Sequence, residues 1–396
     1  MLAMILDTDL IASITKRIHV AKAAGTSLRL RGGGSKDFYG QSLDGDILDM
    51  RALTGIISYE PSELVVTAYA GTPLAELENL LAAQGQYLPF EPPHFGSNAT
   101  VGGMVASGLS GPARASMGAV RDYLLGVRLI NGQGECLTFG GQVMKNVAGY
   151  DVSRLMAGAL GTLGVLLEIS LKVLPIAPAE ATLRCHLPQQ QALDLLNHWG
   201  GQPLPLNASY WMYDGTASSG QDFLFVRLRG AIAAVEAACP RMIADVQAQG
   251  GNAARQDNIQ ANADWAACRE QTLHFFTQPP SPNTCLWRLS LPQTTPALDL
   301  PFEQLIEWHG GLRWLWAPAS AAVQLREIAQ KAKGHATLFR RSGMDSGMDS
   351  GVGTKGSIQI PVFTPLSPVS ARIQGELKKQ FDPAGIFNPC RLSVDW

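Results

Sequence analysis

The chain has 396 residues, of which 46% are hydrophobic and 16% are charged, and its formal net charge is −2. This length and composition indicate a folded protein of about two or three domains with large cores, and they exclude an intrinsically disordered chain. No run of lysines and arginines is present, so a nucleic-acid partner is not expected.

Targeting signals and cysteine spacing restrict the class of protein further. Residues 1–10 carry two aspartates and no basic residue, unlike a signal peptide, and the longest uncharged apolar run (155–167) is shorter than a membrane span. The cysteines are dispersed, with no C-x-x-C and no zinc or iron–sulfur spacing. We therefore expect reduced thiols, no metal site and a cytoplasmic protein. Contact with the inner face of the cell membrane would be peripheral, through a complex.

The chain begins with a predicted amphipathic helix over residues 9–24, which ends at Gly25. Residues 27–30 alternate as a short strand and lead into a glycine loop made of Arg31, Gly32, Gly33, Gly34 and Ser35. This order indicates part of an α/β unit with a phosphate-sized concavity at the end of the strand. Asp37 stands where a Rossmann motif has its third glycine, and a tight glycine turn without a ligand would show the same pattern.

A second glycine-rich segment covers residues 99–112. Strands are predicted before it at 46–50, 55–59 and 64–68, followed by a helix that starts with Thr72 as N-cap. Gly102, Gly103, Gly108 and Gly111 allow close approach of a ligand to the backbone. Residues 104–106 are predicted to start a helix whose first N–H groups can hold an anion, and Thr100 and Ser107 add hydroxyls suited to phosphate. A glycine-rich packing loop is the alternative.

A third segment follows a predicted hairpin (124–130 and 135–139) and runs from Lys145 through Val165. Its repeated glycines let the backbone lie flat against a planar group, whose polar edge Tyr150 and Asp151 can fix. Close packing of the chain is the alternative reading of these glycines.

The aromatic composition of the chain changes near residues 175–178, because all tryptophans lie beyond this point. We therefore expect a domain boundary there. The region that follows alternates strands with helices, which indicates an α+β domain with a mostly antiparallel sheet. The repeat at 343–350 is predicted to be a loop. A fourth ligand-type segment lies at residues 381–389.

These four segments, in this order, resemble the FAD-binding domain of the vanillyl-alcohol oxidase and p-cresol methylhydroxylase (PCMH) family. The resemblance implies an α+β fold: a two-part PCMH-type FAD-binding domain over residues 1–178, completed by a C-terminal return at 373–396. An α+β cap domain over 179–372, with a mostly antiparallel sheet, would serve the substrate or a partner.

The resemblance also implies which residues bind the cofactor. Residues 31–35 and the region of Gly102 and Gly103 would hold the pyrophosphate, residues 161–165 would line the adenine or flavin, and Asn388 would approach the isoalloxazine. Lys36 stands where some relatives have a covalently linked histidine, so the FAD is expected to be non-covalent. The complete expected set is Arg31, Gly32, Gly33, Gly34, Ser35, Thr100, Gly102, Gly103, Ser107, Gly108, Asn146, Gly149, Tyr150, Asp151, Gly161, Gly164, Val165 and Asn388.

Within the family, residues 92–96 and 145–151 are most similar to a flavin-binding subunit of bacterial glycolate-oxidising complexes. Such complexes combine two flavin-type subunits with an iron–sulfur subunit. The resemblance implies oxidation of glycolate, a small 2-hydroxy acid, to glyoxylate by hydride transfer to flavin. An arginine would hold the carboxylate and a histidine or similar base would take the hydroxyl proton. A self-contained 2-hydroxy-acid dehydrogenase and a non-catalytic structural subunit remain as alternatives.

The catalytic residues are not identified by the sequence. Related catalytic subunits carry an H-x-G-D-G-N-x-H motif for metal and substrate, which this chain lacks. The candidates are His335 as a base and Arg288, Arg313 or Arg340 as carboxylate partners, although histidines and arginines on strands often have structural roles.

Overall fold

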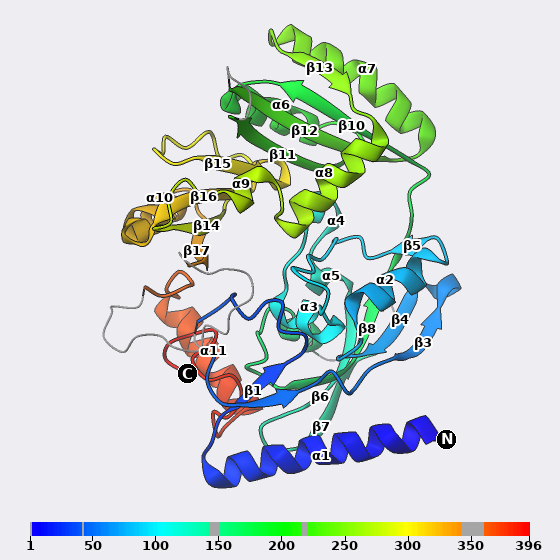
Figure 1. The fold of residues 1–396 in the computed structure, drawn as a ribbon, viewed down its shortest axis with the longest axis vertical. Helices are drawn as coiled ribbons and strands as arrows, with labels where there is room; N and C mark the ends of the chain where they lie inside the picture. The colour runs from blue at the N-terminus through cyan, green and yellow to red at the C-terminus, as the bar shows by residue number, and fades with distance from the viewer. Residues whose placement is uncertain (1, 42, 142–149, 216–219, 342–359) are drawn as a thin grey trace.

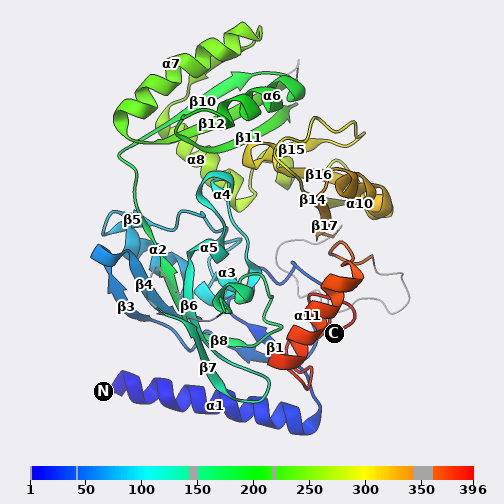
Figure 2. The ribbon, with the colours of Figure 1, turned by 180° about the vertical axis from the view of Figure 1, so that it is seen from behind.

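A computed structural model describes the chain except for residues 1, 42, 142–149, 216–219 and 342–359. It has two parts stacked along the long axis, with the smaller sheets in one part and a large sheet in the other (Figure 1). Seen from behind, α11 (Pro368–Phe381) lies beside the part that contains β1 rather than on the large sheet (Figure 2).

The first part begins with α1 (Leu2–Ala24), β1 (Leu28–Arg31) and β2 (Asp46–Asp49), and the two strands pair in parallel. Ile14 and Ile18 on α1 are buried against this pair because they recur at helical spacing. The other edge of β1 receives the C-terminal segment: the backbone N–H of Leu28 donates to Ile386 at 2.7 Å. The predicted helix and strand are confirmed, with the helix beginning earlier than expected.

An antiparallel five-stranded sheet, ordered β3-β4-β8-β6-β7, completes this part. Its strands are β3 (Ile56–Glu60), β4 (Val65–Tyr69), β6 (Leu124–Ile130), β7 (Cys136–Gly140) and β8 (Val165–Lys172). Two helices, α2 (Leu74–Ala82) and α3 (Val101–Ser107), pack their apolar residues into the core of this sheet. The predicted strands and hairpin are confirmed, but the N-cap of α2 is Pro73, because the Thr72 hydroxyl bonds to Gly55 instead.

Short elements connect these strands. They are β5 (Gln86–Tyr87), α4 (Arg114–Met117), α5 (Val120–Tyr123) and β9 (Leu174–Pro175). The 3-10 turns of the chain are η1 (Pro61–Glu63), η2 (Ser153–Met156), η3 (Trp308–Gly310) and η4 (Ala319–Ala321).

The second part is built on an eight-stranded sheet ordered β13-β10-β12-β11-β15-β16-β14-β17, in which every pair is antiparallel. Its strands are β10 (Ala179–His186), β11 (Leu206–Asp214), β12 (Gln221–Gly230), β13 (Asn252–Arg255), β14 (Thr284–Ser290), β15 (Gln304–Glu307), β16 (Leu312–Pro318) and β17 (His335–Arg340). Its helices are α6 (Gln189–Gly200), α7 (Ile232–Ala248), α8 (Asn258–Glu270), α9 (His274–Thr277) and α10 (Ala322–Lys331). The expectation of an antiparallel α+β sheet is confirmed.

The hydrophobic cores support a division of the chain. Two clusters combine residues before 175 with residues of the C-terminal segment, and two others consist of residues from 179 onward. We therefore propose domains at 1–178 with the return at 373–396, and at 179–372. The repeat at 343–350 lies outside the described residues.

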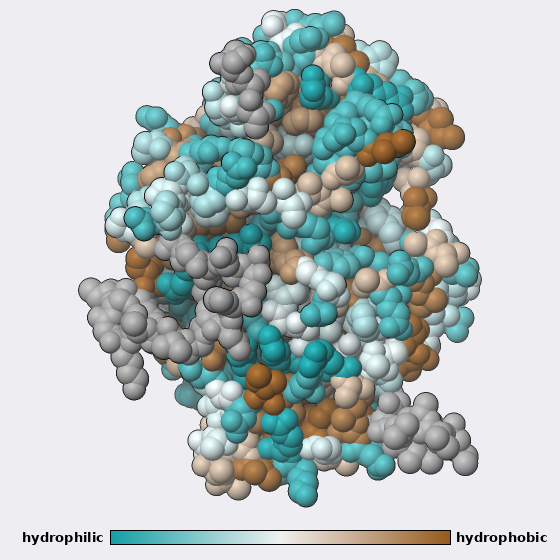
Figure 3. Space-filling view, in the orientation of Figure 1, coloured by the Kyte–Doolittle hydropathy of each residue, from teal (hydrophilic) through white to brown (hydrophobic). Residues whose placement is uncertain are grey.

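Hydrophobic residues on the face shown in Figure 3 are interspersed with hydrophilic ones. None of the described helices has both the length and the apolar content needed to cross a membrane. All six cysteines are free, as expected, and Cys185, Cys239, Cys268 and Cys285 are buried.

Candidate functional site

The glycine loop after β1 presents a series of free backbone donors. The N–H groups of residues 32–36 donate no hydrogen bond to any residue that the structure describes. Just before them, the N–H of Leu30 donates to the side chain of Asn388 at 2.8 Å. Consecutive unpaired amides in a turn form a concave anion-binding site. We call residues 32–36 the amide cradle.

The amide cradle packs so closely against a second loop that side chains are excluded. A Cβ on Gly33 would lie 1.4 Å from the backbone oxygen of Asn98, and one on Gly32 would lie 2.3 Å from Oγ1 of Thr100. Any larger residue would therefore separate the two loops. The glycines of the first segment are needed for this approach, and they bring it against the second segment.

The first N–H groups of α3 are not free, contrary to the expectation from the sequence. These groups are bonded to backbone oxygens of Thr72 and Ala70 and to the side chain of Thr100, which caps the helix. The predicted anion site at this helix end is therefore wrong, and the unpaired donors lie in the amide cradle instead. Gly103 nevertheless has an open side, because a Cβ there would meet only Thr100, at 3.1 Å.

Ser107 and Gly108 close α3. The Ser107 hydroxyl donates its hydrogen to the backbone oxygen of Met104 at 3.0 Å, so it is not available as a donor to phosphate. Gly108 has a φ of +63° and lies against the backbone of Gly158. Through this contact, the third glycine-rich segment packs against α3.

Asn388 ties together three segments that are distant in sequence. Its Oδ1 accepts from Leu30, and its Nδ2 donates to the backbone oxygen of Leu160 at 2.7 Å. A Cβ on Gly161 would lie 2.7 Å from this same Nδ2. The amide of Asn388 therefore holds the loops together, and its expected approach to the isoalloxazine stays a prediction.

The remaining residues of the third segment lie in different environments. The Tyr150 side chain is 93% exposed, and the carboxylate of Asp151 pairs with Arg154 at 2.6 Å. Gly164 lies against Ile130 at the start of β8, where Val165 is buried. Asn146 and Gly149 lie outside the described residues.

A buried cation lies beside the amide cradle. Nζ of Lys36 donates to the hydroxyl of Ser35 at 3.3 Å and to the backbone oxygen of His94 at 3.0 Å. Burial lowers the pKa of Lys36 to about 8, against the opposing influence of Glu270. The ring of His94 bonds to Glu78 at 2.9 Å, which is a structural role.

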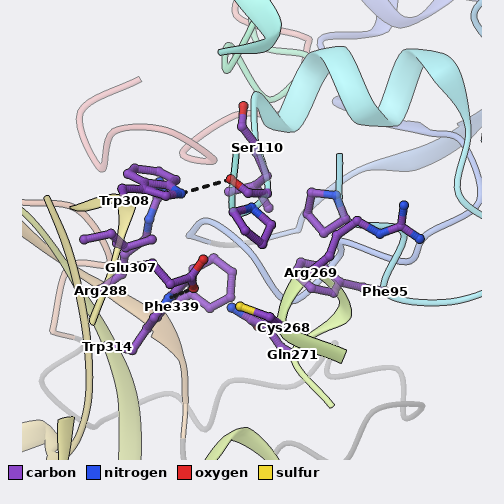
Figure 4. Close-up of a pocket in the computed structure, with 15 residues that line it drawn as sticks. Phe95, Ser110, Cys268, Arg269, Gln271, Arg288, Glu307, Trp308, Trp314 and Phe339 are labelled. Atoms are coloured by element: carbon purple, nitrogen blue, oxygen red, sulfur yellow. Dashed lines mark hydrogen bonds between the residues drawn. The ribbon is translucent and has the colours of Figure 1, made fainter. Parts of the chain in front are cut away.

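A small cavity lies where the two parts of the chain meet. Figure 4 shows aromatic and polar side chains converging on it, with Trp308 reaching across to donate to the backbone oxygen of Gly111 at 3.0 Å. The cavity measures about 20 Å³, which is room for about one water molecule. Its walls are Pro93, Phe95, Leu109, Ser110, Gly111, Pro112, Cys268, Arg269, Gln271, Arg288, Glu307, Trp308, Leu312, Trp314 and Phe339.

Two polar atoms in the cavity wall have no partner. Within the described part of the chain, Nε of Arg288 and Oε1 of Gln271 are buried without a hydrogen bond. The Arg288 guanidinium is held instead by indole rings, 5.1 Å from the centre of Trp308 and 5.9 Å from that of Trp314. One unpaired donor and one unpaired acceptor thus belong to the same cavity.

Glu307 is a buried carboxyl group in the same wall. Its Oε1 accepts from Nε1 of Trp314 at 2.6 Å. Burial raises the pKa of Glu307 to about 7, although hydrogen bonds from Trp314 and Cys268 oppose this shift. A carboxyl group with this pKa changes protonation state near neutral pH, which suits a general base.

The structure places the catalytic candidates from the sequence in different environments. Arg288 reaches the cavity, whereas Arg340 packs on Phe38 and Phe95, and His335 is an exposed residue at the start of β17. Arg313 is fully buried and donates to backbone oxygens, so it is a structural residue. Sequence reasoning missed Glu307, because β15 is short and buried throughout and shows no alternation.

Comparison with known proteins identifies the relatives of this chain. A family model described as "FAD binding domain" matches residues 9–140. The glycolate oxidase subunit GlcE of Escherichia coli is 43% identical over 99% of this chain and 100% of its own length. The glycolate oxidase subunit GlcD of Bacillus subtilis is 28% identical over 35% of this chain and 29% of its own length.

A solved structure of alkyldihydroxyacetonephosphate synthase has a similar fold. It aligns with a TM-score of 0.65 at 15% identity, covering 95% of this chain and 75% of that one. The similarity therefore covers both parts of the molecule, and it supports the expected PCMH-type architecture. Given the full-length match with the bacterial subunit, the chain belongs to the family of the glycolate oxidase subunit GlcE and carries an FAD-binding domain.

Proposed function

We propose that this protein is the FAD-binding subunit of a complex that oxidises glycolate to glyoxylate, and that it passes the electrons to a partner subunit. The observation that carries the proposal is the amide cradle at residues 32–36, whose N–H groups have no partner within the described residues. A pyrophosphate needs such donors, and the protonated Lys36 beside them adds a positive charge. The residues present therefore fit the phosphate portion of FAD.

Each glycine-rich segment has a part in holding the cofactor. The amide cradle would bind the pyrophosphate, and the open side of Gly103 would let the cofactor approach α3. The backbone of residues 161–165 would line the adenine or flavin, with Asn388 fixing its position through Leu160. When bound, FAD supplies a hydride acceptor for the oxidation of an alcohol.

The FAD is proposed to be non-covalent. Lys36, the last residue of the amide cradle, stands where some family members carry a linked histidine, and its amine is already bonded to Ser35 and His94. Acid precipitation of the purified protein should therefore release the yellow colour into the supernatant. Flavin that stays with the precipitate would contradict this part of the proposal.

The partners and location are proposed on the same basis. We expect a second flavin-type subunit and an iron–sulfur subunit in the complex, because the relatives are named as subunits of glycolate oxidase. We expect the complex to be cytoplasmic or attached peripherally at the inner face of the cell membrane. Co-purification with tagged protein from its own cells tests this composition.

The decisive experiment is the visible absorption spectrum of the purified chain, followed by anaerobic addition of glycolate. A yellow protein that bleaches supports the proposal and assigns glycolate oxidation to this subunit. A yellow protein that bleaches only with a partner subunit supports a role in electron transfer. A colourless protein that cannot be reconstituted with FAD would overturn the proposal in favour of a structural subunit.

A further inference from the structure

We propose that a hollow on the large sheet binds a guanidinium group, carried either by a small molecule or by an arginine side chain of a partner protein. The hollow measures about 420 Å³, a volume typical of small-molecule sites. Its lining residues are Gln189, Trp211, Tyr213, Phe302, Glu303 and Gln304. None of them belongs to the amide cradle or to the small cavity between the two parts, so the proposal does not depend on FAD.

The register of two strands brings the lining residues to one face of the sheet. β11 and β15 pair antiparallel, with Trp211 opposite Ile306. Side chains two residues apart in a strand point to the same face, so Tyr213 lies on the face of Trp211, and Gln304 on that of Ile306. α6 packs on this face, and Gln189 is its first residue (Figure 1). The hollow therefore lies on the sheet beside the first turn of α6.

Gln304 provides an unpaired acceptor in the lining. Its side chain is only 7% exposed, and its Nε2 donates to the backbone oxygen of Leu298 at 3.3 Å. Its Oε1, in contrast, is buried without a hydrogen bond to any residue that the structure describes. A buried acceptor without a partner destabilises the protein, and an N–H group of a ligand would remove that cost. Gln304 therefore favours a ligand that carries a hydrogen-bond donor.

The charges around the hollow favour a cationic donor. Burial raises the pKa of the Glu303 carboxyl group, and His274 opposes this shift without forming an ion pair within the described part of the chain. Asp222 lies directly opposite Tyr213 on the neighbouring strand and adds a second carboxyl group near this face. The lining residues include no lysine or arginine. A cationic ligand would supply Glu303 with the counter-ion that its surroundings do not.

The aromatic walls favour a flat cation over a compact one. The Tyr213 side chain is 47% exposed, so a ligand can reach its ring, and Trp211 and Phe302 complete the apolar walls. Trp211 needs no donor or acceptor from a ligand, because its Nε1 already donates to the backbone oxygen of Leu187 at 3.1 Å. A guanidinium stacks its flat faces on aromatic rings while the N–H groups at its edge donate hydrogen bonds. An ammonium group offers no such flat face.

The molecule already holds one of its own arginines in this way. The guanidinium of Arg229 lies 5.5 Å from the centre of the Tyr87 ring, and its Nε donates to Glu180 at 2.7 Å. The hollow offers the same two kinds of partner, an exposed aromatic ring and a carboxylate, and adds an unpaired acceptor. We therefore expect a guanidinium from another molecule to bind there.

Binding is measured by saturation-transfer NMR, in which L-arginine is titrated into the purified protein as isolated. We expect saturable binding with a Kd on the order of 1 mM. Citrulline is the matched ligand, because a neutral urea group of nearly the same shape replaces its guanidinium. It should bind at least about 10-fold more weakly, since it lacks the charge that Glu303 attracts. Equal binding of arginine and citrulline would overturn the assignment of a cation.

The two sources of a guanidinium are distinguished by a second probe. The blocked tripeptide acetyl-Gly-Arg-Gly-amide presents the side chain as a protein does, without free termini. Tighter binding of L-arginine supports a small molecule, whose carboxylate can lie at the first N–H groups of α6. Binding of the tripeptide that equals or exceeds that of L-arginine supports an arginine of a partner protein. Failure of both probes to bind at about 10 mM would overturn the proposal.

Two substitutions at exposed residues test whether the ligand lies in the hollow. Glu303→Gln removes the charge and should weaken arginine binding by about 10-fold. Tyr213→Ala removes the ring and should weaken it by about 3- to 10-fold, whereas Tyr213→Phe retains the ring and should bind within about 2-fold of the wild type. The control, Glu236→Gln, removes an exposed carboxylate outside the hollow and should leave binding unchanged. Wild-type affinity in both Glu303→Gln and Tyr213→Ala would overturn the site.

Discussion

Nη2 of Arg227, on β12, donates to both carboxylate oxygens of Glu91, at 2.6 and 2.7 Å, and this buried pair joins the two parts of the molecule. Arg229 adds a contact at 3.2 Å, and the N–H of Ala113 donates to the same carboxylate. Burial alone would raise the pKa of Glu91, but the two arginines lower it below its usual value. The interface between the two parts is therefore a fixed electrostatic contact.

Replacing Glu91 with glutamine should destabilise the protein, because it leaves two buried arginines without their shared carboxylate. We expect a loss of about 3 kcal/mol in the free energy of unfolding, measured by urea denaturation at pH 7. The contribution of Glu91 is present above the pKa of an unfolded glutamate and is lost as the pH falls through the lower folded value. Glu236→Gln breaks an exposed pair with Arg255 and should cost less than about 1 kcal/mol. Equal effects for the two variants would argue against a special role for Glu91.

His309 should make the same interface sensitive to acid. Its ring bonds to Ser116 in the first part and to Ser209 in the second, each at 2.9 Å, and burial lowers its pKa to about 4. A histidine with a lowered pKa stabilises the fold above its unfolded pKa of about 6.5, and this stability is lost as the pH falls towards 4. Melting temperatures at pH 7 and pH 5 should differ more for the wild type than for His309→Gln. An unchanged difference would assign the acid sensitivity to other groups.

Adding a side chain to the amide cradle should abolish cofactor binding. Gly33→Ala places a methyl group against the backbone of Asn98, which forces the two loops apart. Gly103→Trp fills the open side of α3 and should exclude FAD without that collision. The flavin-to-protein ratio of the purified variants is the measurement. Gly375→Ala, on α11 with open space around it, is the matched control and should retain the wild-type ratio. Stoichiometric flavin in a folded Gly103→Trp would contradict the placement of the cofactor.

The pH dependence of stability should reflect Glu307. Burial raises its pKa to about 7, so its contribution favours the fold at low pH and is lost as the pH rises through about 7. Urea denaturation from pH 5.5 to 9 tests this, and Glu307→Gln should lack the decline near 7. The same decline in the variant would exclude Glu307 as the titrating group.

The four candidate ligand-binding segments show how far sequence reasoning reaches. Their order carried the resemblance that implied an FAD-binding domain, and the close approach of backbones that demands glycine is present at Gly33. They could not show which N–H groups are free, because that depends on partners such as Thr72 and Ala70, which lie in other segments. For the same reason, the hydroxyl of Ser107 was expected in the site but bonds within its own helix.

The residues that line the cavity were harder to predict from the sequence. Arg288, Glu307 and Gln271 come from two strands and the end of a helix, with no fixed spacing between them. Their chemistry arises from what surrounds them: the indole rings beside Arg288 and the burial of Glu307. Neither property is encoded in a local pattern, so both required the tertiary structure.

The position of Asn388 has a consequence for synthesis of the protein. β1 has β2 on one edge and residues 386–388 on the other, so the ribosome must add nearly all of the chain before β1 has both neighbours. Contacts this distant in sequence form late, because a long loop must close first. FAD loading should therefore follow translation, and a nascent chain that stops before residue 386 should bind no flavin even though the glycine loop is already complete.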